Sequence, residues 1–138
     1  MTYNIFEFIG DMAGYEFILL TILTFINNYE LIIIYLIGIL LNHKLNNNIL
    51  KFIFKKYNID PSGHFQSMAF TIVFYILNHT NEFIYNHKYI LYLYAFIAFC
   101  TFNNCFIFNY HKINDIVVGV ICGSLFSYLY VKFSKQFL

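Results

Sequence analysis

The sequence predicts a single all-α domain over residues 1–138, an integral membrane helical bundle of about five transmembrane helices. Hydrophobic residues make up 60% of the chain and charged residues only 11%, whereas a soluble domain has about 45–50% and 25%. The mean hydropathy of +0.63 leaves too little polar surface to cover a water-soluble globule. The apolar residues also gather in runs that approach the length of a membrane span.

The first two expected spans are the least regular. Residues 15–26 form a short apolar run that reaches the lower limit of spanning length when residues 12–14 are added. The second run covers residues 31–41 and continues to residue 54 as an amphipathic stretch with three consecutive asparagines. Unpaired amides are costly in hydrocarbon, so we expect these asparagines to face protein or a polar cavity. The other expected spans are about residues 65–77, 89–102 and 113–133, with a polar loop over residues 78–88.

Two polar segments fall on the same side of the expected bundle. The first, residues 55–61, ends the second span with the only proline of the chain, Pro61. The second surrounds His111, between the fourth and fifth expected spans. Because two spans separate these segments, both face the same side of the membrane, and their residues can form one site.

Charge and cysteine usage exclude several classes of function. The net charge of +1 provides no basic field for nucleic acid, and all eight basic residues are lysines. Cys100, Cys105 and Cys122 have neither CxxC spacing nor histidines at zinc-ligand intervals, so we expect free thiols and no metal site. The N-terminal segment contains Glu7 and Asp11 but no lysine, and so lacks the basic region of a cleavable signal peptide.

Residues 61–64 read Pro-Ser-Gly-His and begin the third expected helix. At a helix N-terminus, free backbone N–H groups and the positive end of the helix dipole favour an anion such as phosphate. A plainer interpretation makes Ser62 an N-cap and Gly63 a loop residue. For these four residues taken alone, the plainer interpretation is the better one.

His111 and Asp115 are four residues apart, so on a helix they share one face. The carboxylate can then accept a hydrogen bond from one ring nitrogen, which leaves the other nitrogen free as a nucleophile. The plainer interpretation, again better for the pair alone, is a solvated histidine near an acidic residue at a helix N-terminus. Together with Lys51 and His64, however, this pair forms a group of ionisable residues at membrane depth, which by default indicates a functional site.

In order and spacing, these segments resemble the three-part signature of the type 2 phosphatidic acid phosphatase (PAP2) family. The family pattern is KxxxxxxRP, then PSGH, then SRxxxxxHxxxD. Lys51 corresponds to the first part, residues 61–64 to the second, and His111 with Asp115 to the third. The resemblance covers roughly residues 42–123, which is most of the chain.

The resemblance implies a helical membrane fold, for which the family usually has six spans rather than five. Gly119 and Gly123 continue the run DxxxGxxxG that many members show. They also form a strip of small residues, and we expect this strip to let the fifth span pack closely against a neighbouring helix.

The departures from the pattern fall on the phosphate ligands. The first motif arginine is replaced by Asn58, and the Ser-Arg pair of the third part by Asn104 and Cys105. If the first part of the pattern is instead aligned from Lys44, Lys51 falls at the first arginine position, but the residues around the lysine no longer match the family. The absence of two planar, bidentate guanidinium groups should weaken phosphoryl binding.

The resemblance implies a metal-independent membrane phosphatase that needs no cofactor. His111 would attack phosphorus to form a phosphohistidine, Asp115 would orient the imidazole, and His64 would protonate the leaving group. The residues implied as holders of the phosphoryl oxygens are Lys51, the Ser62 hydroxyl and the Gly63 amide.

The implied partners are membrane lipids and a lipid phosphate substrate, such as phosphatidate, lysophosphatidate or a polyprenyl diphosphate. Lys55, Lys56 and Lys112 lie on the side of the expected site and can compensate in part for the missing arginines. A second hypothesis is a degenerate member that retains lipid binding with little catalysis. A purely structural membrane protein or pore component would leave the three-part order unexplained.

The other histidines have plainer interpretations. His79 and His87 lie with Glu82 in the opposite loop and are interpreted as solvated. His43 lies in the polar half of the second expected span, where it lines the cavity or makes a structural hydrogen bond. The identity of the substrate and of the membrane, the orientation in it and the oligomeric state, a homo-oligomer included, stay open.

Overall fold

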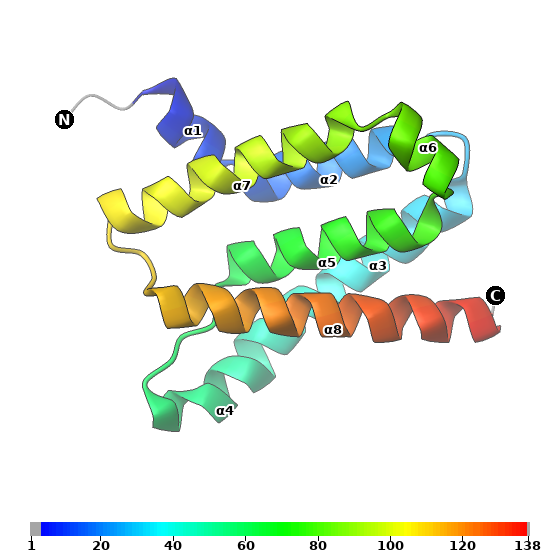
Figure 1. The fold of residues 1–138 in the computed structure, drawn as a ribbon. Coiled ribbons are helices and arrows are strands. Elements are labelled where there is room, and N and C mark those ends of the chain that lie inside the picture. Colours follow the sequence, from blue (N-terminus) through cyan, green and yellow to red (C-terminus); the bar gives the residue numbers. More distant parts are fainter. Residues whose placement is uncertain (1–3, 138) are drawn as a thin grey trace.

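The computed structural model describes residues 4–137, and the regular secondary structure in this range is helical. The long helices lie side by side as a bundle (Figure 1). A π-helical turn, Asn46–Leu50, precedes the fourth helix, and a 3-10 turn, Lys55–Tyr57, follows it. The helices are α1 (Ile5–Asp11), α2 (Ala13–Thr24), α3 (Tyr29–Leu45), α4 (Lys51–Phe54), α5 (Gly63–Asn78), α6 (Asn81–Asn86), α7 (Tyr89–Ile107) and α8 (Ile113–Phe137).

The five predicted apolar runs correspond to α2, α3, α5, α7 and α8, so the prediction of an all-α fold is confirmed. The main difference is at the end of α7, which continues to Ile107 instead of ending near residue 102. The apolar run resumes after a pair of asparagines, and the helix continues across them. Asn104 and Cys105, the positions of the missing Ser-Arg pair, therefore lie on a helix.

Two short helices, α1 and α6, lie outside the predicted spans. A capping box starts α1: the Asn4 side chain accepts a hydrogen bond from the Glu7 N–H at 2.9 Å, and the Glu7 carboxylate accepts one from the Asn4 N–H at 3.0 Å. Thr80 caps α6 by accepting from the Phe83 N–H at 3.1 Å. The prediction of a polar loop over residues 78–88 is therefore wrong for Asn81–Asn86.

The asparagines in the stretch from α3 through α4 were expected to face protein or a polar cavity, and the structure confirms this in part. Asn42 and Asn46 are buried, while Asn47 and Asn48 are exposed. The helical stretch ends where Asn58 adopts a left-handed conformation, with φ 57° and ψ 38°, which asparagine tolerates better than most residues.

The closest helix contact in the bundle joins α5 and α8 at two glycines. A Cβ atom on Gly119 would lie 2.7 Å from the Ser62 carbonyl oxygen, and a Cβ atom on Gly123 would overlap the Gln66 carbonyl oxygen. Further along, the Ser127 hydroxyl donates to the Phe70 carbonyl at 2.8 Å. The predicted packing strip is confirmed, and its partner is the helix that begins with the Pro-Ser-Gly-His segment.

Helix α5 is also the centre of two aromatic core clusters. On one side Tyr75 packs with Phe17 of α2 and Tyr94 of α7. On the other side Phe70 and Phe74 pack against residues of α3 and α8. The Tyr35 and Thr71 hydroxyls are joined at 2.8 Å and the Thr21 and Tyr94 hydroxyls at 2.6 Å, so these buried polar groups are satisfied inside the bundle.

The outward faces of the long helices are apolar as well. Two helices of the described chain, α7 and α8, are each long and apolar enough to cross a membrane. The shorter helices also direct apolar side chains outward, among them Leu19 of α2 and Leu40 of α3, which are 62% and 64% exposed. Apolar surface of this extent is typical of proteins that contact lipid or other proteins.

The histidines at the opposite end are not solvated, so that interpretation is wrong. The His79 ring stacks between Phe25 and Phe83, with ring centroids 4.2 Å and 4.0 Å away, and its Nε2 lies 3.2 Å from the Thr24 hydroxyl. The His87 ring stacks on the other side of Phe83 at 4.2 Å. Burial, with a smaller contribution from His87, lowers the pKa of His79 to about 4, so its ring is neutral at physiological pH.

The glycine contact generates a stability prediction. The change Gly123→Ala forces α8 away from the Gln66 backbone, and overpacking of this kind costs about 1–3 kcal/mol. We expect a lower thermal unfolding midpoint for the purified protein in detergent. The change Gly14→Ala in α2 is the matched control, because no atom lies within 4 Å of the added Cβ. Equal midpoints for the two variants would contradict the packing described here.

Candidate active site

The two predicted functional segments meet at one end of the bundle. The N-termini of α5 and α8 lie at the left-hand end in Figure 1, together with α1, α4 and the C-terminus of α7. The Ser62 N–H donates to the Asp115 carbonyl at 3.1 Å, and the Asp60 N–H donates to the Asp115 carboxylate at 2.9 Å. The two segments therefore lie at the same end of the bundle, close enough for their residues to form one site.

Asp115 is held by the backbone on two sides. Its Oδ1 accepts from Asp60, and its Oδ2 accepts from the Lys112 N–H at 3.0 Å. The carboxylate is buried, and two N–H donors favour its ionised form. The Nδ1 atom of His111 lies 3.6 Å from Oδ2, which is longer than a hydrogen bond. The structure thus brings the pair together but leaves the expected hydrogen bond unformed.

The histidine cavity, as we name it, has a volume of about 480 Å³ and is lined by both His64 and His111. Lys51 reaches it from α4 and is paired with Asp60, with 3.5 Å between Nζ and Oδ1. Lys44, the alternative family lysine, is exposed and lines none of the cavities around the histidines. The other residues that line the histidine cavity are Gly10, Asp11, Asp60, Thr101, Asn104, Cys105 and Tyr110.

A second cavity of about 520 Å³ shares Lys51, His64 and His111 with the first. We name it the α2–α3 cleft, because residues of both helices line it. His43 lines this cleft, and its Nε2 lies 3.0 Å from the Asn47 side chain. The residue therefore both lines a cavity and makes a hydrogen bond, which were the two interpretations of the sequence. The remaining lining residues are Gly14, Tyr15, Ile18, Asn46, Asn47, Gly63 and Ser67.

Ser62 and Gly63 have different surroundings. Ser62 is fully buried, and its hydroxyl caps α5 by accepting from the Phe65 N–H at 3.4 Å. Gly63 lines the α2–α3 cleft beside His64. The serine therefore acts as an N-cap in this structure, whereas the glycine adjoins the space between the histidines.

Buried amides hold the Pro-Ser-Gly-His turn in place. The Asn46 amide donates to the Pro61 carbonyl at 3.1 Å and to the Gln66 side chain at 2.7 Å. The Gln66 amide in turn donates to the Asn42 backbone at 3.2 Å and to its side chain at 3.0 Å. Because fully buried hydrogen bonds are costly to break, this network fixes the turn against α3.

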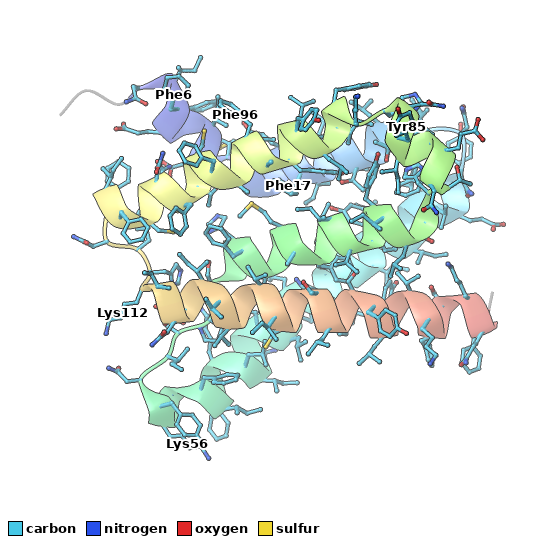
Figure 2. The ribbon with its side chains drawn as sticks, in the orientation of Figure 1. Phe6, Phe17, Lys56, Tyr85, Phe96 and Lys112 are labelled. Atoms are coloured by element: carbon cyan, nitrogen blue, oxygen red, sulfur yellow. The ribbon has the colours of Figure 1, made fainter. Side chains whose placement is uncertain are left out.

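The positions of the missing arginines both adjoin the site. Cys105 is buried and lines the histidine cavity. Asn58 lines a third cavity, of about 400 Å³, which lies beside Asp115. We name this third space the lysine cavity, because Lys51, Lys55 and Lys112 line it. Lys56 is at the far tip of the turn after α4, and its side chain lies over the Tyr57 ring (Figure 2).

Two acidic residues of the histidine cavity, Asp11 and Asp60, were not predicted as site residues. Asp11 is the last residue of α1 and lines the histidine cavity. The available signal was an acidic side chain in an otherwise apolar segment, but the short helix that places it was not predicted. All three cysteines are free, as expected, and no three His, Cys, Asp or Glu side chains of residues 4–137 gather as metal ligands.

The fold and the site define a class of protein: a helical bundle with apolar outward faces and a histidine pair at one end, beside a buried carboxylate and a lysine-lined space. A family model of the PAP2 superfamily matches residues 13–137. The chain belongs to the PAP2 superfamily. No curated protein and no solved structure matches it.

Proposed function

We propose that this protein is a membrane lipid phosphate phosphatase that works without a metal ion, through a phosphohistidine intermediate. Members of the superfamily are generally phosphatases. The observation that carries the proposal is that Lys51, His64 and His111 surround one space, with the Asp115 carboxylate fixed behind His111.

In the first step, His111 is the nucleophile. Its Nδ1 faces Asp115, so Nε2 is the nitrogen available to phosphorus. As the N–P bond forms, the bond from phosphorus to the leaving oxygen breaks, and His64 gives that oxygen a proton. Lys51 and the Gly63 N–H stabilise the charge on the phosphoryl oxygens, while Ser62 holds the turn from which Gly63 acts.

In the second step, water hydrolyses the intermediate. His64, now neutral, accepts a proton from the attacking water as a new P–O bond forms and the N–P bond breaks. Inorganic phosphate leaves, and both histidines return to their starting states. Asp115 stabilises the positive charge that His111 carries while it is phosphorylated.

The three lysines of the lysine cavity supply positive charge in place of the arginines. Lys51 lines both this cavity and the histidine cavity, so a phosphate or diphosphate bound at the histidines also lies near Lys55 and Lys112. Lysine is a point charge without the bidentate geometry of arginine, so it attracts the substrate more than it orients it.

The apolar surroundings support a lipid as substrate. The α2–α3 cleft adjoins a small apolar space of about 60 Å³ lined by Phe17, Ile39 and Met68, and both spaces share Gly14 and Ile18. A headgroup at the histidines therefore lies beside apolar side chains of α2, α3 and α5, while its chains can lie against the apolar outward faces of the helices. This arrangement fits phosphatidate, lysophosphatidate or a polyprenyl diphosphate.

We further propose that α2, α3, α5, α7 and α8 all cross the membrane in a multi-pass arrangement. Support comes from their outward apolar side chains, such as Ile76 of α5, Phe99 of α7 and Leu125 of α8. One span, α5, leads from the site to α6, and one span, α7, leads back. Helix α6 therefore lies on the other side of the membrane from the site.

The topology has a direct test in sealed vesicles. In a background without the native cysteines, Lys56→Cys, Asn109→Cys and Asn86→Cys are labelled with a membrane-impermeant maleimide. We expect Lys56→Cys and Asn109→Cys to react from one side and Asn86→Cys only from the other, because α5 and α7 separate them. Reaction of all three from the same side would contradict five spans.

The activity test uses vesicles with phosphatidate or a polyprenyl diphosphate in EDTA. We expect phosphate release, and we expect His111→Ala to reduce it by at least about a thousandfold, because the nucleophile is gone. Acid quenching should destroy the trapped phosphoenzyme, whereas alkali should preserve it, as for a P–N bond. No release above His111→Ala from either lipid would instead favour the degenerate, lipid-binding member that the missing arginines indicate.

The lysine cavity has its own matched pair of variants. We expect Lys55→Ala and Lys112→Ala each to raise KM about two- to fivefold with little change in kcat, the range for exposed charges. Added salt should narrow the difference by screening. Lys56→Ala removes an equal charge outside the cavity and serves as control. A KM that rises equally in all three variants would show that only the overall charge matters.

A further inference from the structure

Asp11 reaches the histidine cavity from outside the part of the chain that the family model matches. It is the last residue of α1, and the match begins at residue 13. The cavity places Asp11 together with His64 and His111. A carboxylate there would repel a phosphate, so its presence needs a reason that outweighs the repulsion.

Helix α1 is fixed firmly on α7. The Asn104 amide donates to the Glu7 carbonyl at 2.8 Å and to the Asp11 carboxylate at 2.9 Å. The Thr101 hydroxyl donates to the Gly10 carbonyl at 3.2 Å, and a Cβ atom on Gly10 would lie 2.7 Å from the Cys100 carbonyl oxygen. The Asp11 carboxylate is therefore held at a fixed place, and it is held by the residue at the family's serine position, Asn104.

The charges around His64 come from several elements. Burial disfavours a proton on His64 most strongly, His111 disfavours it further, and Asp11 opposes both by favouring it. Lys51 adds positive charge, but Asp60 is paired with it. The negative charge that directly favours a protonated His64 thus comes from α1. The remaining titratable groups that line the two spaces around His64 carry no carboxylate: they are Tyr15, His43, Cys105 and Tyr110.

We propose that Asp11 is a positioning residue whose negative charge opposes the effects of burial and of His111, and so increases the fraction of His64 in the protonated form that gives a proton to the leaving oxygen. This inference rests on the phosphatase reaction proposed above. In that reaction, burial together with the positive charge of His111 and Lys51 would otherwise favour a neutral His64, which cannot assist the leaving group.

The test uses Asp11→Asn, which removes the charge and keeps an oxygen that can accept from Asn104. For a lipid phosphate with an alkoxide leaving group, we expect kcat to fall about tenfold and the alkaline limb of the pH profile to shift to lower pH. For p-nitrophenyl phosphate, whose leaving group needs no proton, kcat should change little. Glu7→Gln is the control, because it removes the other carboxylate of α1, which does not line the cavity.

A second measurement needs no turnover. NMR of histidine-labelled protein, with the His64 signal assigned from His64→Gln, follows the titration of the His64 ring without substrate. We expect its midpoint to lie at least about half a pH unit lower in Asp11→Asn than in the wild type and in Glu7→Gln.

The outcomes separate the two proposals. An unchanged His64 midpoint in Asp11→Asn overturns the inference whether or not the protein is active. Faster turnover of lipid phosphates by Asp11→Asn also overturns it, because the carboxylate would then act only by repelling the substrate. If the His64 midpoint shifts but the protein releases no phosphate, the shift supports the link between Asp11 and His64. The missing phosphate release then contradicts only the proposed phosphatase reaction.

Discussion

The close contact of α5 and α8 at Gly119 and Gly123 is the constraint on which the rest of the structure depends. Both helices begin at the site, so the distance between their axes determines how near His64 and His111 can come. The same contact leaves α5 as the centre of both aromatic clusters. The packing of α5 against α8 in the apolar part of the bundle therefore also determines the geometry at its polar end.

Asp115 has both a structural role and a role in the proposed reaction. Its oxygens accept from two backbone N–H groups, and its own carbonyl accepts from Ser62, so it ties the two functional segments together. The carboxylate that the proposed reaction needs behind His111 is thereby ionised and immobile before substrate arrives. Loss of this residue would disturb the fold of both segments as well as the imidazole.

The distribution of charge around the site differs from the family pattern in a consistent way. The arginine positions hold Asn58 and the buried Cys105, while lysines from α4 and from the start of α8 surround a neighbouring space. In the histidine cavity, Asp11 adds negative charge near His64. The chain thus keeps the residues that the proposed reaction uses to transfer protons and to form the covalent bond, and it changes the residues at the positions that the family pattern gives to phosphate ligands.

The sequence by itself determined the helical class, the five apolar runs and the two polar segments that meet at one end of the bundle, because periodicity, run length and the parity of spans are local or additive properties. It also identified Gly119 and Gly123 as a packing strip. Only the tertiary structure decided that Ser62 is a buried cap, that Asn104 lies on α7 and binds α1, and that Asp11 enters the cavity. These are contacts between residues far apart in the chain, and no local pattern specifies which distant partner a polar side chain will meet.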